Sequence, residues 1–137
     1  MEKKIERFVN IVQDYLSSNV PLKLQRFLNK LHTADVADII SYLEAEEGQK
    51  ILNILKPEVT AEVLNEIDSV LAKELVQAMS PMRLSKMLDT MPPDDAADIL
   101  QYLPEEDHLK VLSQMTEEEA EEVEELIQYR YHNLTSS

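Results

Sequence analysis

The chain has 137 residues, 44% of them hydrophobic, which suits one domain with its own core. It has no cysteine, so disulfides and thiolate metal sites are excluded. Its net charge of −14 disfavours nucleic acid and anionic lipid as partners and favours cations or a basic protein, although acidity can also serve solubility alone. One glycine, no tryptophan and 5% aromatic residues are too few for a β-rich fold, so helices are expected throughout.

Residues 1–31 predict two helices that cap the rest of the domain. The first spans Lys3 to Ser17 and carries its apolar residues on one stripe. Pro21 opens the second, because a proline is tolerated in the first turn of a helix. Charged residues near the start argue against a signal peptide, and no run of roughly 18 apolar residues is present to span or insert into a membrane.

From Thr33 onward the sequence repeats with a period of twelve residues, giving eight units within residues 33–128. The eleventh residue of every unit is apolar, and the eighth is apolar in all units except the last, where it is Glu124. The seventh residue is apolar in all eight units: Ile39, Ile51, Val63, Leu75, Met87, Ile99, Val111 and Val123. Apolar residues at these spacings form a stripe along one side of a helix.

Residues at the unit boundaries are those that begin helices. Prolines open three units, namely Pro57, Pro81 and Pro93. N-cap residues precede three units, namely Asp68, Ser80 and Thr116, and Thr116 with Glu119 has the spacing of a capping box. Each unit therefore predicts a helix of about ten residues, roughly 15 Å long. Such helices are marginal alone, so they must stack as an all-α solenoid of short antiparallel helices.

A second internal match supports the repeat and sets its limits. Residues 35–43 recur as residues 95–103, with six of the nine positions identical. The apolar pattern stops after Tyr129. We therefore predict a helical-repeat domain over residues 1–129 and a tail, or the start of a linker, over residues 130–137.

Three features carry a family resemblance: the twelve-residue units, the segment from Leu31 to Asp35, and the acidic element from Pro93 to Asp98. Roughly residues 20–137 resemble the N-terminal cytosolic domain of MgtE-type magnesium transporters. The resemblance implies a right-handed superhelix at the cytoplasmic face of the membrane, followed by CBS domains and a membrane pore domain in a homodimer. Two departures stand out. The usual His-Pro-x-Asp is His32-Thr33-Ala34-Asp35, and the paired glycines after the last helix are replaced by residues 131–137.

Asp94 and Asp98 are candidate Mg²⁺ ligands, because residues four apart share one face of a helix. Like charges there cost a few tenths of a kcal/mol unless a cation or a base offsets them. Mg²⁺ takes six oxygens, keeps several waters and needs only one or two carboxylates, so this pair would suffice as half of a weak, shared site. Spacing alone favours the simpler interpretation, in which both acids only stabilise a helix N-terminus. The resemblance implies that Asp94, Asp98 and Glu62 are ion ligands, although Glu62 by itself is an ordinary exposed glutamate.

Other charged clusters are weaker candidates. The first copy of the motif has Ala34 in place of an aspartate, so Asp35 and Asp38 are expected to be solvated. The acid run over residues 117–125 lacks the spacing of a calcium loop and predicts a solvated helix face. The three histidines are too scattered for a zinc site, and His108 is expected at a partly buried seam between helices.

No nucleophile with a base and no phosphate-binding glycine loop is present, so we expect neither catalytic nor cofactor-binding residues. The predicted function is that of a magnesium-sensing regulatory domain, which docks onto CBS domains through bridging ions. The alternative is a helical protein-interaction scaffold that resembles the flagellar motor switch protein FliG. The Glu-His-Pro-Gln element of that family is absent, which favours the first interpretation.

Overall fold

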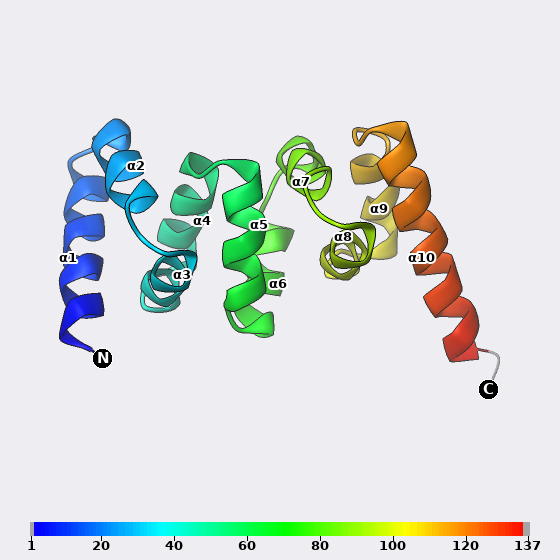
Figure 1. The fold of residues 1–137 in the computed structure, drawn as a ribbon, viewed down its shortest axis with the longest axis horizontal. Helices are drawn as coiled ribbons and strands as arrows, with labels where there is room; N and C mark the ends of the chain where they lie inside the picture. Colours follow the sequence, from blue (N-terminus) through cyan, green and yellow to red (C-terminus); the bar gives the residue numbers. More distant parts are fainter. Residues whose placement is uncertain (1, 136–137) are drawn as a thin grey trace. The chain divides into compact units, whose positions relative to one another are not determined.

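The computed structural model describes residues 2–135 of the chain, with side chains up to residue 133. This part consists of ten α-helices joined by short turns and contains no strand (Figure 1). The helices are α1 (Lys3–Ser17), α2 (Pro21–Asn29), α3 (Thr33–Ser41), α4 (Ala45–Ile54), α5 (Pro57–Glu66), α6 (Ser69–Gln77), α7 (Pro81–Leu88), α8 (Pro93–Leu100), α9 (Glu105–Leu112) and α10 (Glu117–Thr135). The all-α prediction is confirmed, while the right-handed solenoid of antiparallel helices stays a prediction.

The twelve-residue period fixes where the helices begin. Each helix from α3 to α10 starts at the first residue of a predicted unit. The seventh residue is buried in all eight units, and the eighth is buried from Ile40 to Leu100. The eighth position becomes half-buried at Leu112 and exposed at Glu124, where its apolar pattern ends. The predicted stripe is therefore the core-facing side of each helix.

The described residues form two compact units, and the first extends to Leu75. In it, α1 packs on α2 and α3, and α3 packs on α4 and α5. Phe27 of α2 makes T-shaped ring contacts with Phe8 and Tyr15 of α1, with ring centroids 5.6 and 6.2 Å apart. The single glycine, Gly48, allows a close helix contact, since an added Cβ would lie 3.3 Å from Cγ2 of Ile40.

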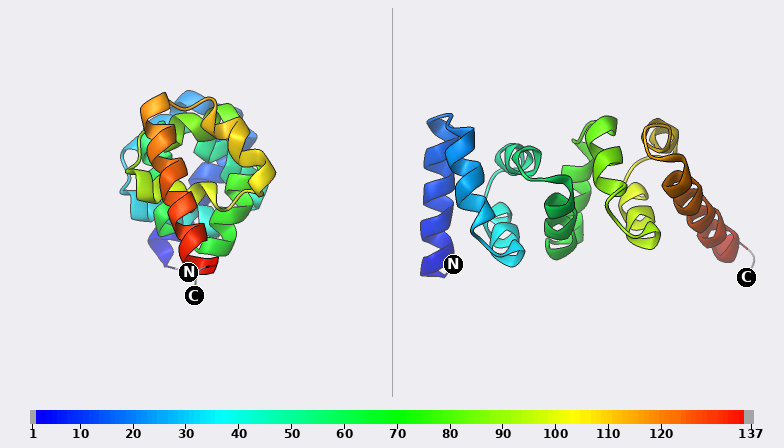
Figure 2. Two further views of the ribbon diagram at one scale, coloured as in Figure 1. Left: turned by 90° about the vertical axis from the view of Figure 1, so that its right-hand side faces the viewer. Right: turned by 45° about the horizontal axis from the view of Figure 1, so that its top comes forward.

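The second unit begins at Val76. In it, α7 packs on α8 and α9, and α10 packs along α8. Helix α10 is the longest at 19 residues and runs to Thr135, drawn from orange to red in Figure 2. Residues 130–135 continue this helix and are not an irregular tail, while the alternative that they begin a linker stays a prediction. Residues 136–137 of the predicted tail lie outside the described residues.

Two of the predicted N-caps are confirmed. The Oγ of Ser80 accepts a hydrogen bond from the N–H of Arg83 at 3.2 Å. Asp68 Oδ2 accepts from the N–H of Val70 at 3.1 Å. These bonds satisfy backbone donors that the first turn of a helix leaves free.

The capping box predicted between Thr116 and Glu119 is wrong, because Thr116 pairs with Asp89 and not with Glu119. The N–H of Thr116 donates to Oδ1 of Asp89 at 3.1 Å, and its hydroxyl donates to the same atom at 3.3 Å. A carboxylate from the end of α7 thus takes the place that Glu119 would hold. A capping box forms instead at the start of α4, between Glu44 and Glu47.

The stripe predicts a contrast between two leucines of the repeat. Leu88, at an eighth position, is 0% exposed, whereas Leu109 is 74% exposed. We expect Leu88→Ala to lower the free energy of unfolding by about 2–5 kcal/mol, because it leaves a cavity in the core. Leu109→Ala, the matched control, should change it by less than about 0.5 kcal/mol. Urea denaturation followed by circular dichroism measures both, and equal effects would contradict the assignment of the core face.

Candidate metal site

Helix α8 has one buried face and one acidic face. Ala96, Ala97, Ile99 and Leu100 are buried in the second unit. Asp94 and Asp98 are both exposed to solvent. The helical period therefore brings the two candidate ligands onto one wet face, as their spacing predicted.

An arginine from another helix already binds this face. Nη1 of Arg130, in α10, donates to Oδ1 of Asp98 at 2.6 Å and to Oε1 of Gln101 at 2.8 Å. Its Nη2 donates to the backbone carbonyl of Asp94 at 3.3 Å. The spacing of the two acids allowed for a base that offsets them, but Arg130 was expected in the tail. One signal could have found it: Arg130 is the only Lys or Arg after Lys110 in a very acidic segment.

The ion pair between Arg130 and Asp98 is open to solvent. The carboxylate side chain is 63% exposed and the guanidinium side chain 32%. Exposed pairs of this kind contribute about 0–1 kcal/mol, because water and salt screen the charges. Breaking this ion pair therefore costs the domain little.

Further acidic side chains lie beside the start of α8. A surface hollow of about 540 Å³ is lined by Pro93 at the start of α8 and, from α10, by Glu122, Glu125, Leu126 and Tyr129. Both glutamates are exposed. Their charges add to the negative potential around the α8 face and raise the local concentration of cations.

Glu62, the third candidate ligand, belongs to the first compact unit. It is exposed on α5, next to the buried residues Ala61 and Val63. Asp94 and Asp98 belong to the second unit. Within residues 2–133, no group of three Asp, Glu or His side chains is close enough to hold a metal ion. A site built on Asp94 and Asp98 would therefore need water and oxygens from another surface.

The first copy of the motif differs from its prediction. Asp35 is not a free solvated acid: its side chain is 17% exposed, and Oδ1 lies 3.3 Å from Nζ of Lys4 in α1. Asp38 is exposed, as predicted. The ion pair was not predicted because Lys4 lies outside the repeat.

The predicted place of His108 at a partly buried seam is confirmed. His108 is half-buried, and its Nε2 lies 3.1 Å from the carbonyl oxygen of Leu103. His32 and His132 are exposed, in different compact units.

The acid run at the start of α10 is solvated with one exception. Glu119 is half-buried, and its Oε1 is buried with no hydrogen-bond partner in the described part of the chain. Burial raises the pKa of Glu119 above its usual value, and the charges of Glu122, Asp89 and Glu118 raise it further. At neutral pH the charged Glu119 carboxylate therefore lowers the stability of the folded domain.

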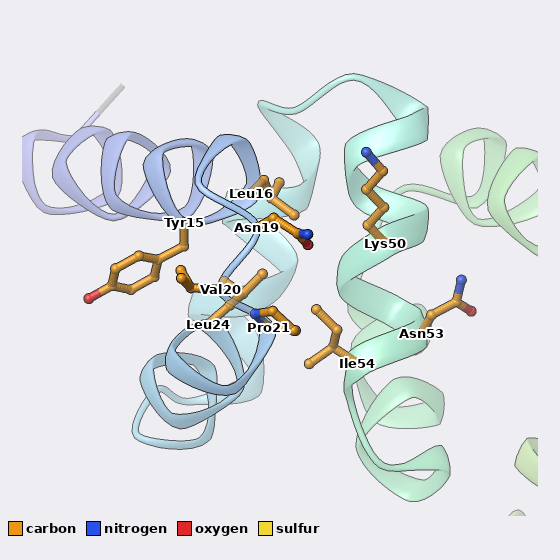
Figure 3. Close-up of a pocket in the computed structure, with 9 residues that line it drawn as sticks. All are labelled: Tyr15, Leu16, Asn19, Val20, Pro21, Leu24, Lys50, Asn53 and Ile54. Atoms are coloured by element: carbon orange, nitrogen blue, oxygen red, sulfur yellow. The ribbon is translucent and has the colours of Figure 1, made fainter.

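A second hollow lies in the first compact unit, which extends to Leu75, where the turn between α1 and α2 faces α4 (Figure 3). It measures about 270 Å³. Its lining is mainly apolar and includes Val20, Leu24 and Ile54, while Asn19 and Lys50 add polar groups. It holds no group of acids, so its chemistry suits a side chain of a protein partner better than a metal ion.

The fold and this face define a class of protein: a helical-repeat domain with an acidic surface, which in residues 2–135 has no helix long and apolar enough to cross a membrane. The chain belongs to the family of the MgtE intracellular N domain, whose family model matches residues 31–132. It is similar to the crystal structure of the soluble part of a magnesium transporter, with 25% sequence identity and a TM-score of 0.76. That match covers 91% of this chain and 50% of the other. No curated protein sequence matches the chain significantly.

The raised pKa of Glu119 predicts how one substitution changes stability with pH. An acid whose pKa is raised on folding costs stability as pH rises through the window between its ordinary value of 4.5 and its raised value. Glu119→Gln should therefore raise the melting temperature at pH 7. At pH 3.5 the gain should vanish, because Glu119 is then protonated in both states.

Thermal unfolding at these two pH values, both away from the isoelectric point of about 4.5, measures the effect. Glu121→Gln is the control, since Glu121 is exposed on the same helix and makes the same charge change. A gain at pH 7 of equal size in both variants would mean that net charge alone is responsible.

Proposed function

We propose that this domain is the magnesium-sensing regulatory domain of a magnesium transporter and lies at the cytoplasmic face of the membrane. The observation that carries the proposal is the exposed pair of carboxylates, Asp94 and Asp98, on one face of α8. Membership of the MgtE intracellular N domain family supports it. On this proposal the domain is not an enzyme, and its role is to bind ions and other domains.

The proposed mechanism is electrostatic. When Mg²⁺ is scarce, the acidic domain and an acidic neighbour repel each other and stay apart. When Mg²⁺ is plentiful, the ion binds Asp94 and Asp98 on one side and oxygens of the downstream CBS domains on the other. Glu62, on α5 of the first unit, would take part in a second ion bridge. The docked state holds the membrane pore closed in a homodimer.

Half of a coordination shell binds weakly. Mg²⁺ holds its waters tightly, and one or two exposed carboxylates replace only some of them. The domain alone should therefore bind Mg²⁺ in the millimolar range or more weakly, and the CBS surface supplies the missing affinity. Weak binding suits a sensor, because the ion must leave when its concentration falls.

A protein-interaction scaffold is the second candidate function. The observation that favours it is the apolar hollow of about 270 Å³ in the first unit, which needs no ion to receive a side chain. The reading frame beyond Ser137 distinguishes the two functions. Strands typical of CBS domains and several apolar spans favour transport, whereas a further helical domain favours a scaffold.

The proposal predicts the effect of removing both carboxylates in a transporter that contains this domain. Asp94→Asn with Asp98→Asn should shift pore closure to at least about tenfold higher Mg²⁺, because losing roughly 1.4 kcal/mol of ion binding changes an equilibrium tenfold. Channel current at graded cytoplasmic Mg²⁺ is the measurement.

The matched control is Glu105→Gln with Glu106→Gln, which removes two exposed acids from the first turn of the next helix, α9. It makes the same change in net charge and should leave the Mg²⁺ dependence nearly unchanged. An unaltered dependence in the Asp94 and Asp98 variant would refute the proposed site.

A further inference from the structure

Arg130 donates to three oxygens, two from residues of α8 and one from Gln101, the residue that follows this helix. They are a carboxylate oxygen of Asp98 at 2.6 Å, the amide oxygen of Gln101 at 2.8 Å and the backbone carbonyl of Asp94 at 3.3 Å. Carboxylate and carbonyl oxygens are also the protein ligands that Mg²⁺ takes. The guanidinium and a metal ion therefore need the same atom, Oδ1 of Asp98, or oxygens beside it.

We infer that Arg130 is a built-in competitor of the metal ion: its guanidinium binds Asp98 in the ion-free domain, and Mg²⁺ must displace it. This inference rests on the proposed function, because it concerns the same face of α8. It assigns to Arg130 the regulation of ion affinity and not the binding of the ion.

The position of Arg130 suits this role. It is carried by α10, which packs along α8, so its effective concentration at Asp98 is fixed by the fold and not by the solution. The nearest bases before it in the sequence are Lys110 and Lys86, on α9 and α7.

The ion pair is weak enough to raise the Mg²⁺ concentration needed for binding without preventing binding. A pair as exposed as this one contributes about 0–1 kcal/mol, which corresponds to a change in ion affinity of up to about fivefold. Mg²⁺ at sufficient concentration therefore displaces the guanidinium. Once displaced, Arg130 no longer ties the C-terminal half of α10 to α8.

Titration of the 137-residue chain with Mn²⁺, a paramagnetic substitute for Mg²⁺, tests the inference. Broadening of the backbone amide signals of residues 94–101 reports ion binding at α8. Arg130→Gln should bind Mn²⁺ about two- to fivefold more tightly than the original chain. Arg130→Lys should fall between them, because an ammonium lacks the planar fork that holds several oxygens at once.

Lys110→Gln is the matched control. It removes one positive charge from the same compact unit, where Lys110 pairs with Asp107 at 3.7 Å. Circular dichroism confirms that each variant is folded. In the original chain, the Nε–H signal of Arg130 should also shift during a Mg²⁺ titration, with the same midpoint as the amide of Asp98.

The outcomes separate the inference from the proposed function. If Mn²⁺ broadens residues 94–101 equally in all variants, or if Lys110→Gln tightens binding as much as Arg130→Gln, the competition is refuted and the metal site stands. If Arg130→Gln weakens binding, Arg130 holds the site together and the inference is again wrong. If these residues are not broadened in any variant, the metal site and the inference both fail.

Discussion

The fold depends on burying one apolar stripe of each short helix. Helices of eight to ten residues, such as α4, α7, α8 and α9, would be marginal in isolation. They persist because the seventh residue of every unit is buried against neighbouring helices. The same packing leaves the opposite face of each helix in water. Charged residues on that face are not part of the apolar core, so a binding face can be built there without weakening the core.

The acidic face of α8 illustrates how little such a site costs the domain. Negative charges in the first turn of a helix are stabilised by the helix dipole, which offsets part of their mutual repulsion. Arg130 offsets more of it at Asp98. Each of these effects is worth no more than about 1 kcal/mol. The electrostatic terms at this face therefore nearly cancel, and the acids add little to or subtract little from the stability of the domain.

The sequence predicted what is local and periodic, and missed what joins distant residues. The starts of all eight repeat helices and the buried seventh positions follow from the spacing of apolar residues alone. The bond between Arg130 and Asp98 joins residues 32 apart, and that between Thr116 and Asp89 joins residues 27 apart. No period encodes such pairs, because they depend on which helices pack together. The end of α10 was missed for a related reason: beyond Ile127 its described side chains are exposed or half-buried, so no apolar stripe marks the helix.

The two copies of the repeated motif differ in how far their ion pairs are exposed to water. Each copy meets one base from a helix at an end of the chain. Lys4 of α1 pairs with Asp35, whose side chain is 17% exposed, whereas Arg130 of α10 pairs with Asp98, whose side chain is 63% exposed. Breaking a more buried pair leaves an uncompensated charge out of water, which costs more than breaking an exposed one. The first pair therefore holds α1 against α3, while the second leaves the oxygens of α8 accessible to a competing cation.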